Sequence, residues 1–205
     1  MTLPPCYSWS PLGANLAVPY EAPQGRRVNA IGGYLSRGVE AGRFEYAAYA
    51  SLPASRGGKR RKSPEEVAAC YGLSPQEVGP IDSARFLAFV WRLAGRPALY
   101  PGGWRRARPL FIVLDNYSVH KSQPVQGALP GLEAANVFLW YLPSYSPELS
   151  DIEPVWHVVK HHEMPQRSQT DIRDQKRAVE QALARKAEAL RARHDKTTRL
   201  LCATA

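Results

Sequence analysis

Apolar and polar positions repeat with two periods along this chain, and the two periods divide it into strands and helices. Residues 28–35 and 44–49 carry β-forming, partly alternating side chains on either side of a turn segment, which predicts an antiparallel hairpin. The glycine pair at 32–33 predicts a bulge or a close approach of the backbone. The continuous apolar run at 110–114 predicts a strand buried on both faces. The run at 137–142 predicts a second, all-apolar strand, in which Trp140 is expected to be a packing residue. The helical pattern between those runs favours parallel pairing.

Apolar residues at helical spacing predict the remaining elements. Phe86, Phe89 and Leu93 lie on one stripe of a helix that Asp82 or Ser83 can cap. Proline disrupts the interior of a helix and fits its first turn, so Pro154 predicts a helix start between Asp151 and Glu153. The other expected elements are a short strand near residues 7–9, a helix starting at 63–64, a helix at 125–135 and a long basic helix at 171–199.

Composition narrows the class of protein. The 205 residues suffice for one sizeable domain and a helical appendage. A net charge of +9 favours a polyanionic partner, most simply nucleic acid. The three cysteines are far apart, which indicates reduced thiols without a disulfide framework or a zinc site. No apolar run reaches transmembrane length and no signal-peptide pattern opens the chain, so we expect no membrane partner and a cytoplasmic protein.

Two acids lie where α/β sheets carry their chemistry. Asp115 directly follows the apolar run that ends at Leu114, and Glu153 falls in the first turn of an expected helix. Carboxylate oxygens suit Mg²⁺ or Mn²⁺, and paired ions of this kind assist phosphodiester cleavage. Each acid also has an alternative role, because Asp115 can open a turn and Glu153 can complete a capping box with Ser150. Asp151 is the second choice for the role of Glu153.

Histidines and basic residues add further candidates. Glu153, His157 and His161 recur at helical spacing and could bind zinc, although no HExxH motif is present. The basic run at 56–62 fits either DNA phosphate contacts or a solvated loop. The candidate DNA contacts are Asn116, His120, Lys121, His157, Lys160, Lys59, Arg60 and Arg61.

Two blocks of sequence resemble one known family. Residues 114–122 (LDNYSVHKS) and 142–156 (LPSYSPELSDIEPVW) closely resemble the catalytic domain of mariner-type bacterial insertion-sequence transposases, the DDE superfamily endonucleases. Residues 8–13 and 26–32 look like the early strands of that family. The resemblance covers roughly residues 7–165 and is weakest across residues 51–80. Ser150-Asp151 departs from the family, which usually has Asn-Pro there.

The resemblance implies an α/β, ribonuclease H-like fold with a mixed sheet, antiparallel strands first and parallel βα units afterwards, and helices on both faces. It also implies that Asp115 and Glu153 are the second and third catalytic acids and bind two Mg²⁺ or Mn²⁺ ions. Proteins of this family cut DNA at transposon ends and join the 3′-hydroxyl to target DNA. The implied partner is therefore DNA in a bacterial cytoplasm, and a homodimer is an open option.

The first acid of the family has no counterpart in this sequence. It lies on a first strand, upstream of the segment that residues 7–13 resemble, whereas no Asp here precedes Asp82. Glu21, Glu40 and Glu45 fall at other places in the pattern. We therefore expect a truncated transposase that lacks the first strand, has open sheet edges and is inactive alone. The alternative is a non-catalytic basic DNA-binding remnant.

The expected organisation follows from these observations. Residues 1–165 form a partial endonuclease domain with a basic insertion at about 51–80. Residues 166–205 form a C-terminal basic helix.

Overall fold

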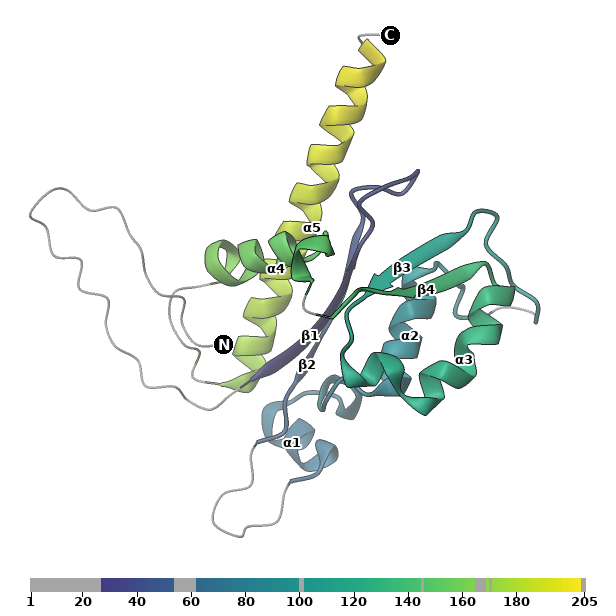
Figure 1. The fold of residues 1–205 in the computed structure, drawn as a ribbon. Helices are drawn as coiled ribbons and strands as arrows, with labels where there is room; N and C mark the ends of the chain where they lie inside the picture. Colours follow the sequence, from purple (N-terminus) through teal and green to yellow (C-terminus); the bar gives the residue numbers. More distant parts are fainter. Residues whose placement is uncertain are drawn as a thin grey trace, which may run out of the picture. The chain divides into compact units, whose positions relative to one another are not determined.

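A computed structural model describes residues 27–53, 62–99, 102–144, 146–164, 169 and 171–203 (Figure 1). The chain divides into two compact units. The first consists of Met1–Asn29, Ala48–Pro80 and His157–Lys186, and the second of Ala30–Ala47, Ile81–Trp156 and Ala187–Ala205. The strand expected near residues 7–9 lies outside the described residues.

Strands β1 (Val28–Tyr34) and β2 (Phe44–Ala50) form the predicted hairpin. The amide of Leu35 donates to the carbonyl of Arg43 and the amide of Ser51 donates to the carbonyl of Arg27, both at 2.9 Å. Because residues early in β1 pair with residues late in β2, the two strands are antiparallel. The hairpin prediction is confirmed.

In the first unit, helix α1 (Pro64–Tyr71) starts at the predicted place. The Ser63 side chain accepts from the amide of Glu66 and the Glu66 carboxylate accepts from the amide of Ser63, which completes a capping box. The buried Val67 and Ala68 pack with Ala50, Val78 and Ile172 in a small apolar core. A short 3₁₀ turn, η1 (Pro75–Glu77), follows α1.

The long helix α5 (Ile172–Ala203) brings a buried lysine to the first unit. Lys176 is 4% exposed, and its ammonium group lies 2.7 Å from Glu77 and 2.6 Å from Glu180. The hydrogen bond from Lys176 and the amide of Ser74 lower the pKa of Glu77 to about 2. Burial disfavours the charged lysine, but the hydrogen bonds to Glu180 and Glu77 outweigh it and raise the pKa of Lys176.

The second unit contains a two-stranded parallel sheet. Strands β3 (Leu110–Leu114) and β4 (Val137–Tyr141) pair in parallel, with Leu110 opposite Val137 and Leu114 opposite Tyr141. The connection runs through a 3₁₀ turn, η2 (Ser118–Lys121), and helix α3 (Gln123–Ala134). Parallel pairing with a helical connection is the predicted arrangement and can be followed in Figure 1.

Helix α2 (Ser83–Leu93) packs its apolar stripe into the core of this unit. Its cap is Asp82, whose carboxylate accepts from the amide of Arg85 at 2.9 Å, so the alternative of a Ser83 cap is not realised. Phe86 and Val90 join Val125, Leu132 and Val137 in the core. Leu110, Ile112, Leu114 and Leu139 pack against this core from one face of the sheet.

The opposite face of β3 and β4 corrects a sequence prediction. The apolar run at 110–114 predicted a strand buried on both faces, but Phe111 and Val113 are 58% and 51% exposed. Trp140 of β4 is 64% exposed. Strand side chains alternate between faces, and the register places Phe111 opposite Phe138 and Val113 opposite Trp140. This apolar face is therefore open, and Trp140 is not the packing residue that an apolar run suggests.

Apolar packing on α2 connects the hairpin with the parallel sheet inside the second unit. Leu35 packs with Phe89 and Leu93, and Ile31, Leu110 and Ile112 surround this cluster. The two sheets share no strand, and each has two strands among the residues that the structure describes. Within the second unit, the hairpin and the parallel sheet are therefore joined by apolar packing on α2 and not by hydrogen bonds between strands.

Helix α4 (Glu153–Val158) begins at Glu153, within the predicted interval, and a π-helical turn (Val159–Glu163) continues it. A 3₁₀ turn, η3 (Pro147–Leu149), precedes it. None of the described helices combines the length and apolar character needed to cross a membrane.

Candidate metal-binding site

The turn after β3 fixes the Asp115 carboxylate through one of its oxygens. The amide of Tyr117 donates to Oδ1 of Asp115 at 3.1 Å, and Nδ1 of His120 lies 2.8 Å from the same oxygen. The side chain is 71% exposed. Asp115 thus does open a turn, as its alternative role suggested, yet Oδ2 has no protein partner among the described residues.

Asn116 attaches this turn to the end of β4. Its side-chain amide donates to the carbonyl of Leu142 at 2.7 Å, and the amide of Leu142 donates to the carbonyl of Leu114 at 2.8 Å. Because parallel strands end at the same edge, Asp115 and the segment that leads to α4 leave the sheet together. The Asn116 amide, a candidate DNA contact, is engaged within the protein.

Glu153 lies in the first turn of α4 and is exposed. Its amide donates to the carbonyl of Ser150 at 3.1 Å, but its carboxylate makes no hydrogen bond or ion pair within the described part of the chain. The capping box with Ser150 is therefore not formed, and the carboxylate stays available for another partner. An acid at a helix start is also favoured by the helix dipole.

Asp151, the competitor of Glu153, is engaged elsewhere. Its Oδ2 accepts from the hydroxyl of Ser36 at 2.6 Å, across 115 residues of sequence. This contact joins the start of α4 to the residues that follow β1. No local sequence signal predicts it, because a serine in a turn segment carries no indication of a distant partner.

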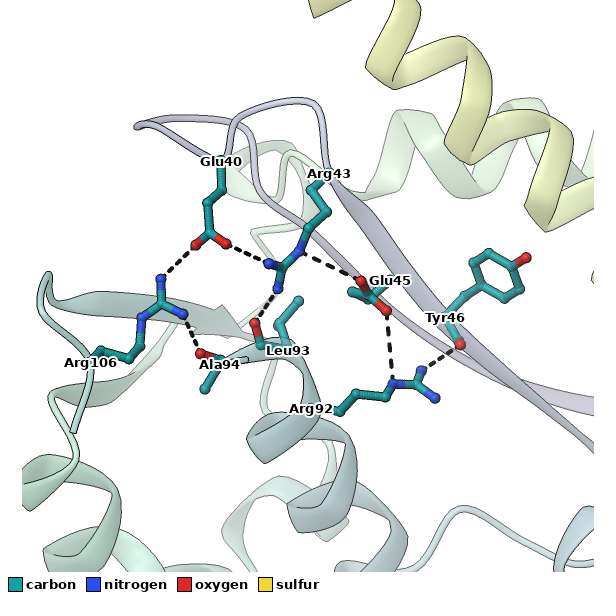
Figure 2. A network of polar contacts seen from close by, with 8 residues as sticks. All are labelled: Glu40, Arg43, Glu45, Tyr46, Arg92, Leu93, Ala94 and Arg106. Carbon is teal, nitrogen blue, oxygen red and sulfur yellow. Dashed lines mark hydrogen bonds and ion pairs between the residues drawn. The ribbon is translucent and has the colours of Figure 1, made fainter. Parts of the chain in front are cut away.

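Two other acids are neutralised by arginines (Figure 2). Glu40 accepts from Arg43 and from Arg106, each at 2.5 Å, and Glu45 lies 3.6 Å from Arg43 and 3.9 Å from Arg92. The guanidinium groups of Arg43 and Arg106 also donate to the carbonyls of Leu93 and Ala94 at the end of α2. These carboxylates serve the packing of the hairpin on α2 and are poor candidates for metal ligands.

The described residues contain no group of three or more His, Cys, Asp or Glu side chains that could hold a metal ion. The zinc alternative with Glu153, His157 and His161 consequently gains no support. His157 and His161 instead pack against each other, with ring centroids 4.5 Å apart. Asp115 and Glu153 offer the hard oxygen donors that Mg²⁺ and Mn²⁺ prefer, so they match such an ion in donor type, although two carboxylates alone do not make up a group of that size.

The remaining candidate DNA contacts differ in their surroundings. Lys121 is exposed and its ammonium group lies 5.7 Å from the centre of the Tyr141 ring. His157 and Lys160 are exposed on α4 and on the π-helical turn. Lys59, Arg60 and Arg61 lie outside the described residues.

Comparison with models of known protein families identifies the family of this chain. The model of the DDE superfamily endonuclease family matches residues 74–176, half of the chain and a span that includes both Asp115 and Glu153. The chain belongs to the DDE superfamily endonuclease family. A comparison with curated proteins found no match. DDE endonuclease domains are generally dependent on divalent metal ions, bind DNA and cleave it in the manner of transposases, and the mixed α/β architecture is compatible with such a domain.

Proposed function

We propose that this chain is the catalytic domain of a mariner-type bacterial insertion-sequence transposase with a ribonuclease H-like fold, acting on DNA in the cytoplasm. One observation carries the proposal: the family match encloses Asp115 and Glu153, and both carboxylates are exposed and open to a ligand. A net charge of +9 supports a DNA partner. A homodimer is part of the proposal.

Asp115 and Glu153 are the residues that would hold the divalent ions. Bound Mg²⁺ or Mn²⁺ supplies stabilisation of charge on the attacking and leaving oxygens of a phosphodiester. In the first step, the oxygen of water attacks phosphorus and the bond to the 3′-oxygen breaks, which leaves a 3′-hydroxyl and a 5′-phosphate. In the second step, that 3′-hydroxyl attacks a phosphorus of target DNA and the 3′-oxygen of the target leaves.

The contribution of this chain is to hold its two carboxylates ready and to bind the DNA backbone. The turn of Asp115 is tied to β4 through Asn116, which limits its movement. We propose that Lys121, His157 and Lys160, all exposed, contact DNA phosphates. Lys59, Arg60 and Arg61 are proposed to add to this binding.

We further propose that residues 1–205 do not turn over DNA by themselves. No Asp precedes Asp82 in the sequence, and Glu40 and Glu45 are bound to arginines. With two carboxylates instead of three, metal binding is expected to weaken because Mg²⁺ retains its water shell strongly. A strand carrying the first Asp of the family would complete the ligand set.

Nicking of DNA that carries the terminal repeats of the element tests the proposal. We compare the 205-residue chain with the same chain extended at its N-terminus by a strand that carries the family's first Asp. We expect Mg²⁺-dependent nicking only from the extended chain, abolished by Asp115→Asn or Glu153→Gln. Asp151→Asn is the matched control, since asparagine can still accept from Ser36, and we expect it to keep the activity.

Two results would contradict the proposal. Nicking that survives both Asp115→Asn and Glu153→Gln would remove these residues from the reaction. Salt-sensitive DNA binding without nicking in either chain would favour the alternative of a non-catalytic DNA-binding remnant.

A further inference from the structure

The ring of His120 is directed at the Asp115 carboxylate. Its Nδ1 atom lies 2.8 Å from Oδ1 of Asp115 and 3.3 Å from the backbone carbonyl oxygen of the same residue. An ionised carboxylate and a carbonyl oxygen can only accept hydrogen bonds. We therefore assign a proton to Nδ1 of His120, which faces the backbone carbonyl and Oδ1 of Asp115.

The protein holds this imidazole in place from several sides. The ring packs on Phe86 of α2, with centroids 4.6 Å apart, and meets Tyr117 edge-on at 5.9 Å. The hydroxyl of Tyr141 in β4 donates to the backbone carbonyl of His120 at 2.8 Å. The side chain is 18% exposed. A histidine that served DNA contact alone would not need these restraints, so they favour a role toward Asp115.

Two groups lie against the same carboxylate oxygen of Asp115. Oδ1 accepts from the amide of Tyr117 and lies 2.8 Å from Nδ1 of His120, and these two neighbours restrict the rotation of the carboxylate. Oδ2 has no protein partner within the described ranges. Ligating carboxylates are commonly oriented by hydrogen bonds of this kind, and the orienting groups affect metal affinity strongly.

We propose that His120 is a positioning residue, which holds Asp115 through Oδ1 so that Oδ2 is available to a divalent metal ion. The inference rests on the proposed function, because it takes Asp115 as a metal ligand. The anchored turn supports it, since Asn116 binds the carbonyl of Leu142 and keeps the backbone of Asp115 at the end of the sheet. His120 thereby prepares the site before any ion or DNA binds.

Two substitutions separate hydrogen bonding from packing. His120→Asn keeps a donor near the position of Nδ1 but loses the ring, whereas His120→Phe keeps a ring that can pack on Phe86 but loses the donor. The readout is the broadening of the Tyr117 amide resonance by Mn²⁺ in the 205-residue chain, which detects millimolar binding and requires no catalysis. Asp115→Asn is the control for the site.

We expect His120→Asn to bind Mn²⁺ almost as the unaltered chain does and His120→Phe to bind about 10-fold more weakly or worse. Rescue by asparagine but not by phenylalanine is a result that a purely structural role for the ring would not give. Unchanged Mn²⁺ binding in His120→Phe would overturn the inference. Equal loss in both variants would also overturn it, because packing would then explain the effect.

The ring nitrogens provide a second test without metal. Imidazole ¹⁵N resonances of the unaltered chain are expected to show the proton of His120 on Nδ1. A proton on Nε2 instead would overturn the positioning role even where Mn²⁺ binds at Asp115. The expected tautomer without any Mn²⁺ broadening at Tyr117, either in the 205-residue chain or in the chain extended by the strand with the first Asp, would overturn the proposed metal site itself.

Discussion

Gly32 shows how a single missing side chain sets the packing of the hairpin. A Cβ atom at this position would lie 2.8 Å from Cζ2 of Trp156 and 2.9 Å from Cε2 of Phe44. Those two rings meet edge-on with centroids 5.9 Å apart, a favourable arrangement for aromatic pairs. The close approach predicted for the glycine pair is therefore confirmed. A Cβ atom at Gly33 would lie 2.6 Å from Cδ2 of Leu93.

Gly32→Ala is expected to lower the free energy of unfolding by about 1–3 kcal/mol, because the added methyl group has to displace rigid rings. Gly127→Ala is the matched control: a Cβ on this α3 glycine would meet nothing within 4 Å, and alanine favours helix. We expect the control to raise stability by about 0.5–1 kcal/mol. Urea unfolding measures both, and equal midpoints for Gly32→Ala and the unaltered chain would show that the rings yield without cost.

At the scale of elements, rules that depend on neighbouring residues in the sequence predicted where helices begin. They did not predict which faces of the strands are covered by other elements. The Ser63-Pro64 start, the Asp82 cap and the start of α4 at Glu153 each depend on a few neighbouring residues, and the structure confirms them. The exposure of Trp140 could not be predicted, because an apolar run does not reveal whether another element covers each face.

The contacts of the candidate site show the same difference between local features, which the sequence predicts, and distant pairings, which it does not. The position of Asp115 at a strand end is a local feature, and the contact with His120, five residues later, lies within reach of sequence reasoning. The pairing of Ser36 with Asp151 cannot be predicted in this way, because 115 residues separate the partners. Burial of Lys176 was missed for the same reason, since Glu77 is 99 residues away.

The Glu77–Lys176 contact makes the stability of the chain dependent on pH. The pKa of Glu77 is about 2 in the folded protein and 4.5 ordinarily, so the folded state favours the ionised carboxylate. Its contribution is fully present above about pH 4.5 and is lost as the pH falls toward 2. We expect Glu77→Gln to remove this part of the acid destabilisation.

Urea unfolding at several pH values between 7 and 2 checks the Glu77 prediction. Glu65→Gln is the control, because Glu65 also lies in an acidic helix start of the first unit but has no lysine partner among the described contacts. An unchanged pH profile for Glu77→Gln would show that the carboxylate contributes nothing through Lys176.

At the scale of the whole molecule, excess positive charge is expected to govern encounters with DNA. The net charge of +9 attracts a polyanion over distances limited by the Debye length, about 8 Å at physiological salt. Long-range attraction and local phosphate contacts both weaken with salt. The loss of affinity through long-range attraction depends on how many charges are removed. The loss through local phosphate contacts depends on which basic residues are removed.

Simultaneous Lys59→Ala, Arg60→Ala and Arg61→Ala substitutions test the local contribution. Each lost phosphate contact reduces the slope of log affinity against log salt by about 0.9, so we expect a reduction of about 2.7 on duplex DNA. Alanine at the exposed Arg177, Arg191 and Arg193 of α5 removes the same charge and is expected to change the slope less. Fluorescence anisotropy at several salt concentrations measures both, and equal reductions would contradict a specific role for the basic run.

The open face of β3 and β4 also gives the molecule a reporter of its own. Trp140 is 64% exposed beside Phe111 and Val113, so water reaches its indole and lowers the energy of its fluorescence. Anything that settles on this face, whether another segment, another protein or an aggregate, would exclude that water and shift the emission to the blue. A single tryptophan left at 140 would therefore register the covering of the sheet without any added dye.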